Sequence, residues 1–205
     1  MGQNQIDYSS SIFGIHFFNN DIGVIIKGGS FYKTTDGGTN WIDKYPQYGF
    51  ASQLEVVNDK TFFIAGGRTY DNVAYGEMHK SIDSGETWVV LSLPIEIQQS
   101  EIISIYFLTS AIGYISTFEN KIFKTVNGGN DWEKLNQFKF GTIRDIVFEN
   151  ENVGYLTSNN SIYKTSNGGT EWLLDYQSNS ELYYIEKTNS KIFVYGRNGI
   201  ILKKE

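Results

Sequence analysis

Only a few side chains in this sequence could form a site for chemistry, and they suggest two kinds of site. The 205 residues include no cysteine and three arginines, Arg68, Arg144 and Arg197. Converging arginines would bind an acidic ligand, because a guanidinium group pairs with a carboxylate through two parallel hydrogen bonds. Glu55 and Asp145 are carboxylates on predicted inner strands, and glycoside hydrolysis needs two carboxylates about 5–10 Å apart.

The composition excludes several classes of function. Without cysteine there is no disulfide framework, thiolate metal site or cysteine nucleophile. The formal net charge of −6 argues against a nucleic-acid-binding surface, which needs a basic stripe to neutralise phosphates. No apolar run approaches the roughly 20 residues of a membrane-spanning helix. The polar start at residues 1–5 does not resemble a signal peptide.

The elements that position these residues come from an internal repeat. Four tryptophans, at positions 41, 88, 132 and 172, are 47, 44 and 40 residues apart, and each ends the same nine-residue phrase. A period of this length is typical of propellers and solenoids. We call the four phrases, 33–41, 80–88, 124–132 and 164–172, the repeated turns. Each contains an aspartate or asparagine, a glycine two positions later and the tryptophan: Asp36, Gly38 and Trp41; Asp83, Gly85 and Trp88; Asn127, Gly129 and Trp132; and Asn167, Gly169 and Trp172.

Each repeated turn has a structural explanation. Asp-Gly and Asn-Gly dipeptides favour chain reversal between two strands, and the side-chain oxygen can accept hydrogen bonds from the amides of the turn. The tryptophan that begins the next strand would fill space against neighbouring strands. Because Asn127 and Asn167 replace Asp36 and Asp83, we expect turn geometry rather than a bound metal. The Gly-Gly pairs belong to these turns and not to a phosphate-binding loop, so we expect no cofactor.

Short segments with alternating apolar residues and many β-branched or aromatic side chains surround each turn, and they indicate four strands per unit. The sequence therefore predicts an all-β protein, a five-bladed β-propeller of four-stranded antiparallel blades in a single domain, 1–205. The predicted units are 12–52, 53–100, 101–141, 142–180 and 181–205, the last completed by 1–11.

At this point the residues resemble a known family. Segment 81–88, Ser-Ile-Asp-Ser-Gly-Glu-Thr-Trp, matches in full the S/T-x-D-x-G-x-T-W phrase of the Asp-box, or BNR, repeat. The Tyr-Lys-Thr-x-x-Gly-Gly phrases and segment 195–203 most resemble the photosystem II stability/assembly factor-like group. This resemblance implies a non-enzymatic β-propeller that binds other proteins, and it favours an extracytoplasmic location.

The basic and aromatic candidates should share one face of such a propeller. Their positions within the repeat place them opposite the repeated turns, where propellers usually bind ligands. An insertion of about five residues in the second unit, where loops tolerate extra length at little cost, adds two tyrosines to this face; it is equally a longer hairpin without further consequence. The ligand-face candidates are Lys27, Arg68, Tyr70, Tyr75, Arg144 and Arg197.

Three functions compete for this face, and a protein partner is the one that we favour. Sialidases also carry Asp-boxes and three arginines, but their Phe/Tyr-Arg-Ile-Pro phrase is absent, because Asp145 and Ile146 follow Arg144. A glycan-binding or glycosidase propeller is the alternative, with Glu55 and Asp145 as the carboxylate pair. The interpretation that we favour for these two carboxylates is structural: they cap strand ends or pair with Arg144 or Lys27.

The N-terminus should close the ring of blades. Segment 5–10, Gln-Ile-Asp-Tyr-Ser-Ser, resembles segment 173–178, Leu-Leu-Asp-Tyr-Gln-Ser, which follows the last tryptophan. We therefore predict that residues 5–10 form the outer strand of the fifth blade, which would leave no open sheet edge. Deletion of residues 1–9 should strongly lower the melting temperature, and an unchanged melting temperature would contradict closure by this segment.

Overall fold

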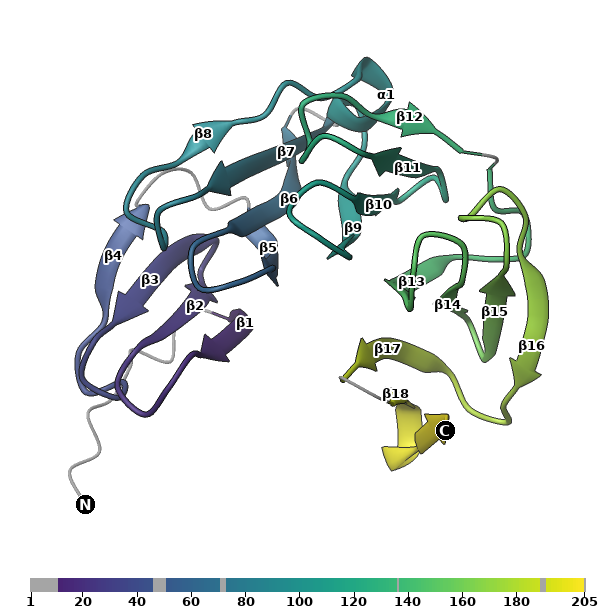
Figure 1. Cartoon of the computed structure of the whole chain (residues 1–205). Helices are drawn as coiled ribbons and strands as arrows, with labels where there is room; N and C mark the ends of the chain where they lie inside the picture. Colours follow the sequence, from purple (N-terminus) through teal and green to yellow (C-terminus); the bar gives the residue numbers. More distant parts are fainter. Residues whose placement is uncertain (1–10, 46–50, 71–72, 136, 189–190, 205) are drawn as a thin grey trace. The chain divides into compact units, whose positions relative to one another are not determined.

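Five antiparallel sheets follow one another along the chain in the computed structural model (Figure 1), which describes residues 11–45, 51–70, 73–135, 137–188 and 191–204. The chain packs as two compact units, residues 1–92 and residues 93–205.

The first unit contains two four-stranded sheets, in each of which the strands lie side by side in chain order. Their strands are β1 (Ile12–Phe17), β2 (Gly23–Lys27), β3 (Ser30–Thr34) and β4 (Ile42–Tyr45), then β5 (Ala51–Val56), β6 (Phe62–Tyr70), β7 (Val73–Ser81) and β8 (Val89–Val90).

The second unit contains the other three sheets, which again follow chain order. A single helical turn, α1 (Ile95–Gln98), precedes them, and the short 3-10 helix η1 (Arg197–Gly199) joins the last two strands. The strands are β9 (Ile102–Phe107), β10 (Gly113–Thr117), β11 (Ile122–Thr125) and β12 (Glu133–Lys134); β13 (Ile143–Phe148), β14 (Gly154–Ser158), β15 (Ser161–Thr165) and β16 (Leu173–Gln177); and β17 (Leu182–Lys187), β18 (Ile192–Gly196) and β19 (Ile201–Lys204).

These sheets confirm the prediction of an all-β, five-bladed architecture. The first four have four strands, and the fifth has three strands among the described residues. The segment predicted to complete the fifth blade, 1–11, lies outside the described residues apart from Ser11. The predicted insertion lengthens the hairpin of β6 and β7, each of which has nine residues.

A buried hydroxyl group organises each repeated turn. In all four turns it accepts a hydrogen bond of 2.9 Å from the amide of the glycine four residues later. It also donates to the Asp or Asn side chain two residues later, at 2.8–3.0 Å. These bonds satisfy turn groups that would otherwise be buried without partners. The hydroxyls belong to Thr34, Ser81, Thr125 and Thr165.

The turns with aspartate and the turns with asparagine keep the same geometry by exchanging donor and acceptor. Where the turn has Asp, the residue four positions later donates to it; where the turn has Asn, the Asn amide donates to an acidic residue four positions later. The pairs are Asp36 with Asn40, Asp83 with Thr87, Asn127 with Asp131 and Asn167 with Glu171. This exchange explains in physical terms why the copies of the phrase differ at these positions.

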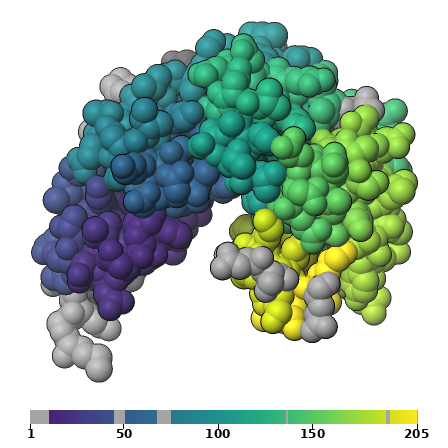
Figure 2. Space-filling view, in the orientation of Figure 1, coloured from purple at the N-terminus to yellow at the C-terminus, as the bar shows by residue number. Residues whose placement is uncertain are grey.

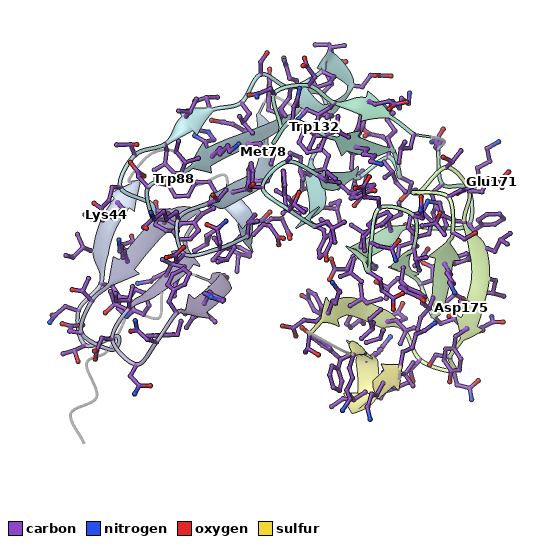
Figure 3. The ribbon with its side chains drawn as sticks, viewed as in Figure 1. Lys44, Met78, Trp88, Trp132, Glu171 and Asp175 are labelled. Carbon is purple, nitrogen blue, oxygen red and sulfur yellow. The ribbon has the colours of Figure 1, made fainter. Side chains whose placement is uncertain are left out.

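Two tryptophans of the repeated turns, Trp88 and Trp172, pack against the preceding sheet. The ring of Trp88 (Figure 3) lies edge-on to Phe31 of the first sheet, with the ring centroids 4.8 Å apart. Trp172 belongs to one buried cluster with Tyr114 and Ile122 of the third sheet. Because a sheet that is apolar on one face must bury that face, each such tryptophan joins two successive sheets.

A lysine at the end of β3 adds a polar contact to the same junction in the first unit. The Nζ of Lys33 lies 2.9 Å from Oε1 of Glu86, and it donates to the carbonyl oxygen of Ser84 at 3.1 Å. The second repeated turn is therefore held on the first sheet both by an indole ring and by an ion pair.

The buried tryptophan gives a direct test of this packing. Trp172 is 6% exposed, whereas its neighbour Leu173 is 73% exposed. Trp172→Ala should lower the free energy of unfolding by about 3–5 kcal/mol, because it removes a ring between two sheets. Leu173→Ala is the matched control and should change the free energy of unfolding by less than about 0.5 kcal/mol. Urea unfolding measures both, and equal effects would contradict the packing.

Candidate functional site

The predicted ligand-face residues of the first unit lie near hairpins away from the repeated turns. Lys27 ends β2 and pairs with Ser30 at the start of β3, whereas the far end of β3 enters the turn. Arg68 and Tyr70 lie on β6, and Arg68 pairs with Tyr75 of β7 in the lengthened hairpin. The side chain of Tyr75 is exposed.

Two of the predicted residues lie in the second unit, Arg144 on β13 and Arg197 in η1. Nη1 of Arg197 lies 3.5 Å from Oε2 of Glu181, and the hydroxyl of Tyr183 donates to the same oxygen at 2.9 Å. The hydrogen bond to Glu181 raises the pKa of the Tyr183 phenol, while the positive charges of Arg197 and Arg144 act to lower it. Arg197 and Tyr183 thus share the carboxylate of Glu181, and the charge of Arg144 acts on the same phenol. We call these four residues the Arg144–Arg197 group.

The Arg144–Arg197 group is open to ligands. The side chains of Arg197 and Glu181 are 65% and 48% exposed, so their ion pair is solvated and contributes at most about 1 kcal/mol. A ligand carboxylate can replace Glu181 at little cost and gain charge-assisted hydrogen bonds from the guanidinium. Tyr183 and Glu181 were not predicted, because no repeated phrase of the sequence marks them.

Asp145 links the first strands of three successive sheets. Its Oδ1 accepts hydrogen bonds from Oγ of Ser104 on β9, at 2.7 Å, and from its neighbour's amide, that of Ile146, at 2.9 Å. Its Oδ2 accepts from the amide of Ile185 on β17, at 3.0 Å. Ser104 and Ile185 lie 41 and 40 residues away in sequence. That separation is one repeat in each direction, and it is the signal by which the partners could have been found.

The environment of Asp145 makes its carboxyl group weakly acidic. Burial raises its pKa to about 6, although the three hydrogen bonds act in the opposite direction, and the charge of Glu186 raises it further. Such a value is characteristic of tuned functional groups, but it also occurs in structural networks. Here both carboxylate oxygen atoms accept hydrogen bonds from donors on the protein's own strands. Glu55, the predicted second carboxylate, lies on β5 of the other unit.

Two tyrosines extend this region on the fifth sheet. Tyr184 and Tyr195 are stacked, with ring centroids 5.4 Å apart, and both are exposed. Burial raises the pKa of Tyr195, and the charges of Glu186 and Asp145 add to that effect. Among the described residues, no group of three or more His, Asp or Glu side chains is placed to hold a metal ion. No helix in the described part of the chain is long and apolar enough to cross a bilayer.

Solved structures of other proteins share this fold. YCF48 in complex with a D1 peptide superposes with a TM-score of 0.71 at 17% identity, over 98% of this chain and 67% of that one. A GH74 enzyme from Niastella koreensis gives 0.75 at 19% identity, over 95% of this chain and 35% of the enzyme. YCF48 from Cyanidioschyzon merolae gives 0.53 at 16% identity, over 97% of both chains. No family model and no curated protein matches the sequence.

The chain is a β-propeller. At these identities the likeness concerns the fold alone, and the same fold carries both a peptide-bound protein and an enzyme. The chain also spans only about a third of the enzyme's length. The choice between a binding function and a catalytic function must therefore rest on the side chains of this propeller.

Asp145 gives the propeller a pH dependence of known sign. Its pKa in the folded chain, about 6, exceeds the value of about 3.9 expected when unfolded. The folded state thus binds the proton more tightly, and its stability should rise as the pH falls through 6. As the pH falls from about 7.5 to about 4.5, thermal unfolding should show the melting temperature of the wild type rising relative to that of Asp145→Asn.

The control for this experiment is Glu101→Gln, which removes an exposed carboxylate from the segment before β9. The difference in melting temperature between Glu101→Gln and the wild type should change much less with pH than the difference between Asp145→Asn and the wild type. A difference between wild type and Asp145→Asn that stays constant over this pH range would contradict the assigned environment.

Proposed function

We propose that this propeller is a non-catalytic module that binds another protein through the end of its sheets opposite the repeated turns. The observation that carries the proposal is the Arg144–Arg197 group, in which Arg197 and the phenol of Tyr183 contact the exposed carboxylate of Glu181 and the charge of Arg144 acts on the same phenol. Arginine and tyrosine are enriched where proteins bind one another, because they combine apolar area with directional hydrogen bonds.

The chemistry of the group points to an acidic ligand. Arg197 already holds a carboxylate of its own chain, that of Glu181, through a solvated ion pair. An aspartate or glutamate side chain of a partner can take the same place and contact Arg144 as well. We therefore expect the partner to present an acidic, extended segment. Lys27, Arg68, Tyr70 and Tyr75 remain predicted contributors from the first unit.

Two further observations support binding rather than catalysis. The carboxylate of Asp145 accepts three hydrogen bonds from strands of its own unit, which suits a structural connector better than a general acid that must reach a substrate. The hydroxyl-centred geometry of the repeated turns also agrees with the resemblance to Asp-box propellers. The likeness of the fold to that of YCF48 in complex with a D1 peptide favours a protein ligand.

Charge reversal at the two arginines tests the proposal. Peptides selected against the wild-type chain from a random display library should be rich in Asp and Glu. Binding of the selected peptides to the double variant Arg144→Glu with Arg197→Glu should weaken at least tenfold, or about 1.4 kcal/mol, with an unchanged melting temperature. Lys191→Glu, an exposed change on another segment, is the control and should retain binding.

Unchanged affinity of the double variant would contradict the proposed site. A glycan array probed with the same wild-type protein tests the carbohydrate alternative. Specific glycan binding, combined with failure to select any peptide, would replace a protein partner by a glycan.

A further inference from the structure

Three Asn-Gly pairs occur in the sequence, and one of them lies outside the repeated turns. The pairs at 127–128 and 167–168 belong to the third and fourth repeated turns, whereas the pair at 198–199 joins β18 to β19. These two strands belong to the fifth sheet, which is yellow in the space-filling view and lies against the lime-green fourth sheet (Figure 2). An asparagine before glycine is chemically vulnerable, because glycine has no side chain to shield its backbone nitrogen.

The reaction open to such a pair is deamidation. The backbone nitrogen of the glycine attacks Cγ of the asparagine and forms a new C–N bond. The side-chain nitrogen leaves as ammonia and takes the proton of the glycine amide with it. Water then opens the resulting cyclic imide at either of its carbonyl carbons, which gives aspartate or isoaspartate. No oxidant or reductant takes part, and water is the co-reactant.

In the third repeated turn, hydrogen bonds hold the groups that would react. Oδ1 of Asn127 accepts from Oγ1 of Thr125 at 3.0 Å and from the amide of Asp131 at 2.9 Å, and its Nδ2 donates to the Asp131 carboxylate. The amide of Gly128, the nucleophile of the reaction, donates to the carbonyl oxygen of Ala111 at 2.8 Å. Attack on Cγ would require these hydrogen bonds to open.

The fourth repeated turn holds its pair in the same way. Oδ1 of Asn167 accepts from Oγ1 of Thr165 at 3.0 Å and from the amide of Glu171 at 2.9 Å. The amide of Gly168 donates to the carbonyl oxygen of Asn152 at 2.8 Å, and this glycine is buried. The contacts that build the repeated turns therefore also shield their asparagines from deamidation.

Asn198 and Gly199 lack these restraints. Both are exposed, and their φ angles are 60° and 72°, as an Asn-Gly turn between two strands requires. Among the described residues, the Asn198 side chain makes no hydrogen bond, and the Gly199 amide donates to no carbonyl oxygen outside its own turn. A Cβ built on Gly199 would meet no described atom within 4 Å. The turn therefore has room to rearrange toward the imide.

We propose that Asn198 is a modification site of the folded chain, at which the side-chain amide is converted to a carboxylate while Asn127 and Asn167 stay intact. The chemistry is that of the dipeptide, and the fold selects which of the three pairs reacts. The product adds a negative charge beside Arg197 in the sequence. This consequence rests on the proposed function: an acidic segment bound at the Arg144–Arg197 group would meet a like charge, so the modification would weaken binding irreversibly.

Peptide mapping by mass spectrometry tests the site on the full chain. The chain is incubated in mildly alkaline buffer, because the attacking nitrogen must lose its proton, and in water enriched in heavy oxygen, because water supplies the new oxygen atom. Asn198 should be converted at least about tenfold faster than Asn127 or Asn167, and its product should carry the heavy isotope.

The same chain unfolded in concentrated urea is the matched control. Unfolding removes the hydrogen bonds of the repeated turns, so the three Asn-Gly pairs should then be converted at similar rates. Equal conversion of the three asparagines in the folded chain would overturn the proposal. A tenfold preference for Asn198 that persisted in urea would also overturn it, because the preference would then come from neighbouring residues in the sequence and not from the fold.

A separate measurement follows the effect on binding. Asn198→Asp reproduces the charge of the product and should weaken binding of the selected acidic peptides about threefold. Asn130→Asp, the same change at an exposed position of a repeated turn, should leave binding unchanged. Equal binding by the two variants would contradict the effect on binding. If the wild type selects no acidic peptide, the proposed function fails, while the mass measurement still decides whether Asn198 is modified.

Discussion

The burial of an aromatic ring between successive sheets is the contact on which this fold depends. Two tryptophans of the repeated turns fill the junction with the sheet before them: Trp88 packs against Phe31, and Trp172 is buried beside Tyr114 and Ile122. The hydroxyl-centred turn holds the backbone that carries the ring. Local hydrogen bonding and long-range packing therefore support the same arrangement, which is a property of sequences that specify one fold.

Much of this architecture follows from the sequence because its signals are local and repeated. A glycine after Asp or Asn, a hydroxyl two residues before and a tryptophan after predict the turns, and their spacing predicts the number of sheets. In the sequence, the pair Asp36 and Asn40 of one turn and the pair Asn127 and Asp131 of another differ only as departures from the repeated phrase. The geometry shows that donor and acceptor are exchanged and that the hydrogen bond is kept.

The functional residues were harder to predict, because they depend on contacts between strands about one repeat apart. Asp145 was recognisable as a carboxylate on an inner strand. Its three donors come from a neighbouring amide and from the two flanking inner strands, whose register cannot be deduced from composition.

The central claim is that the ring of a repeated-turn tryptophan joins two successive sheets. A double-mutant cycle of Trp172→Ala and Ile122→Ala, followed by urea unfolding, tests it most directly, because these residues lie on the fourth and third sheets and in one buried cluster. The account predicts an interaction energy of at least about 0.5 kcal/mol between the two side chains. Additive effects of the two substitutions would contradict it.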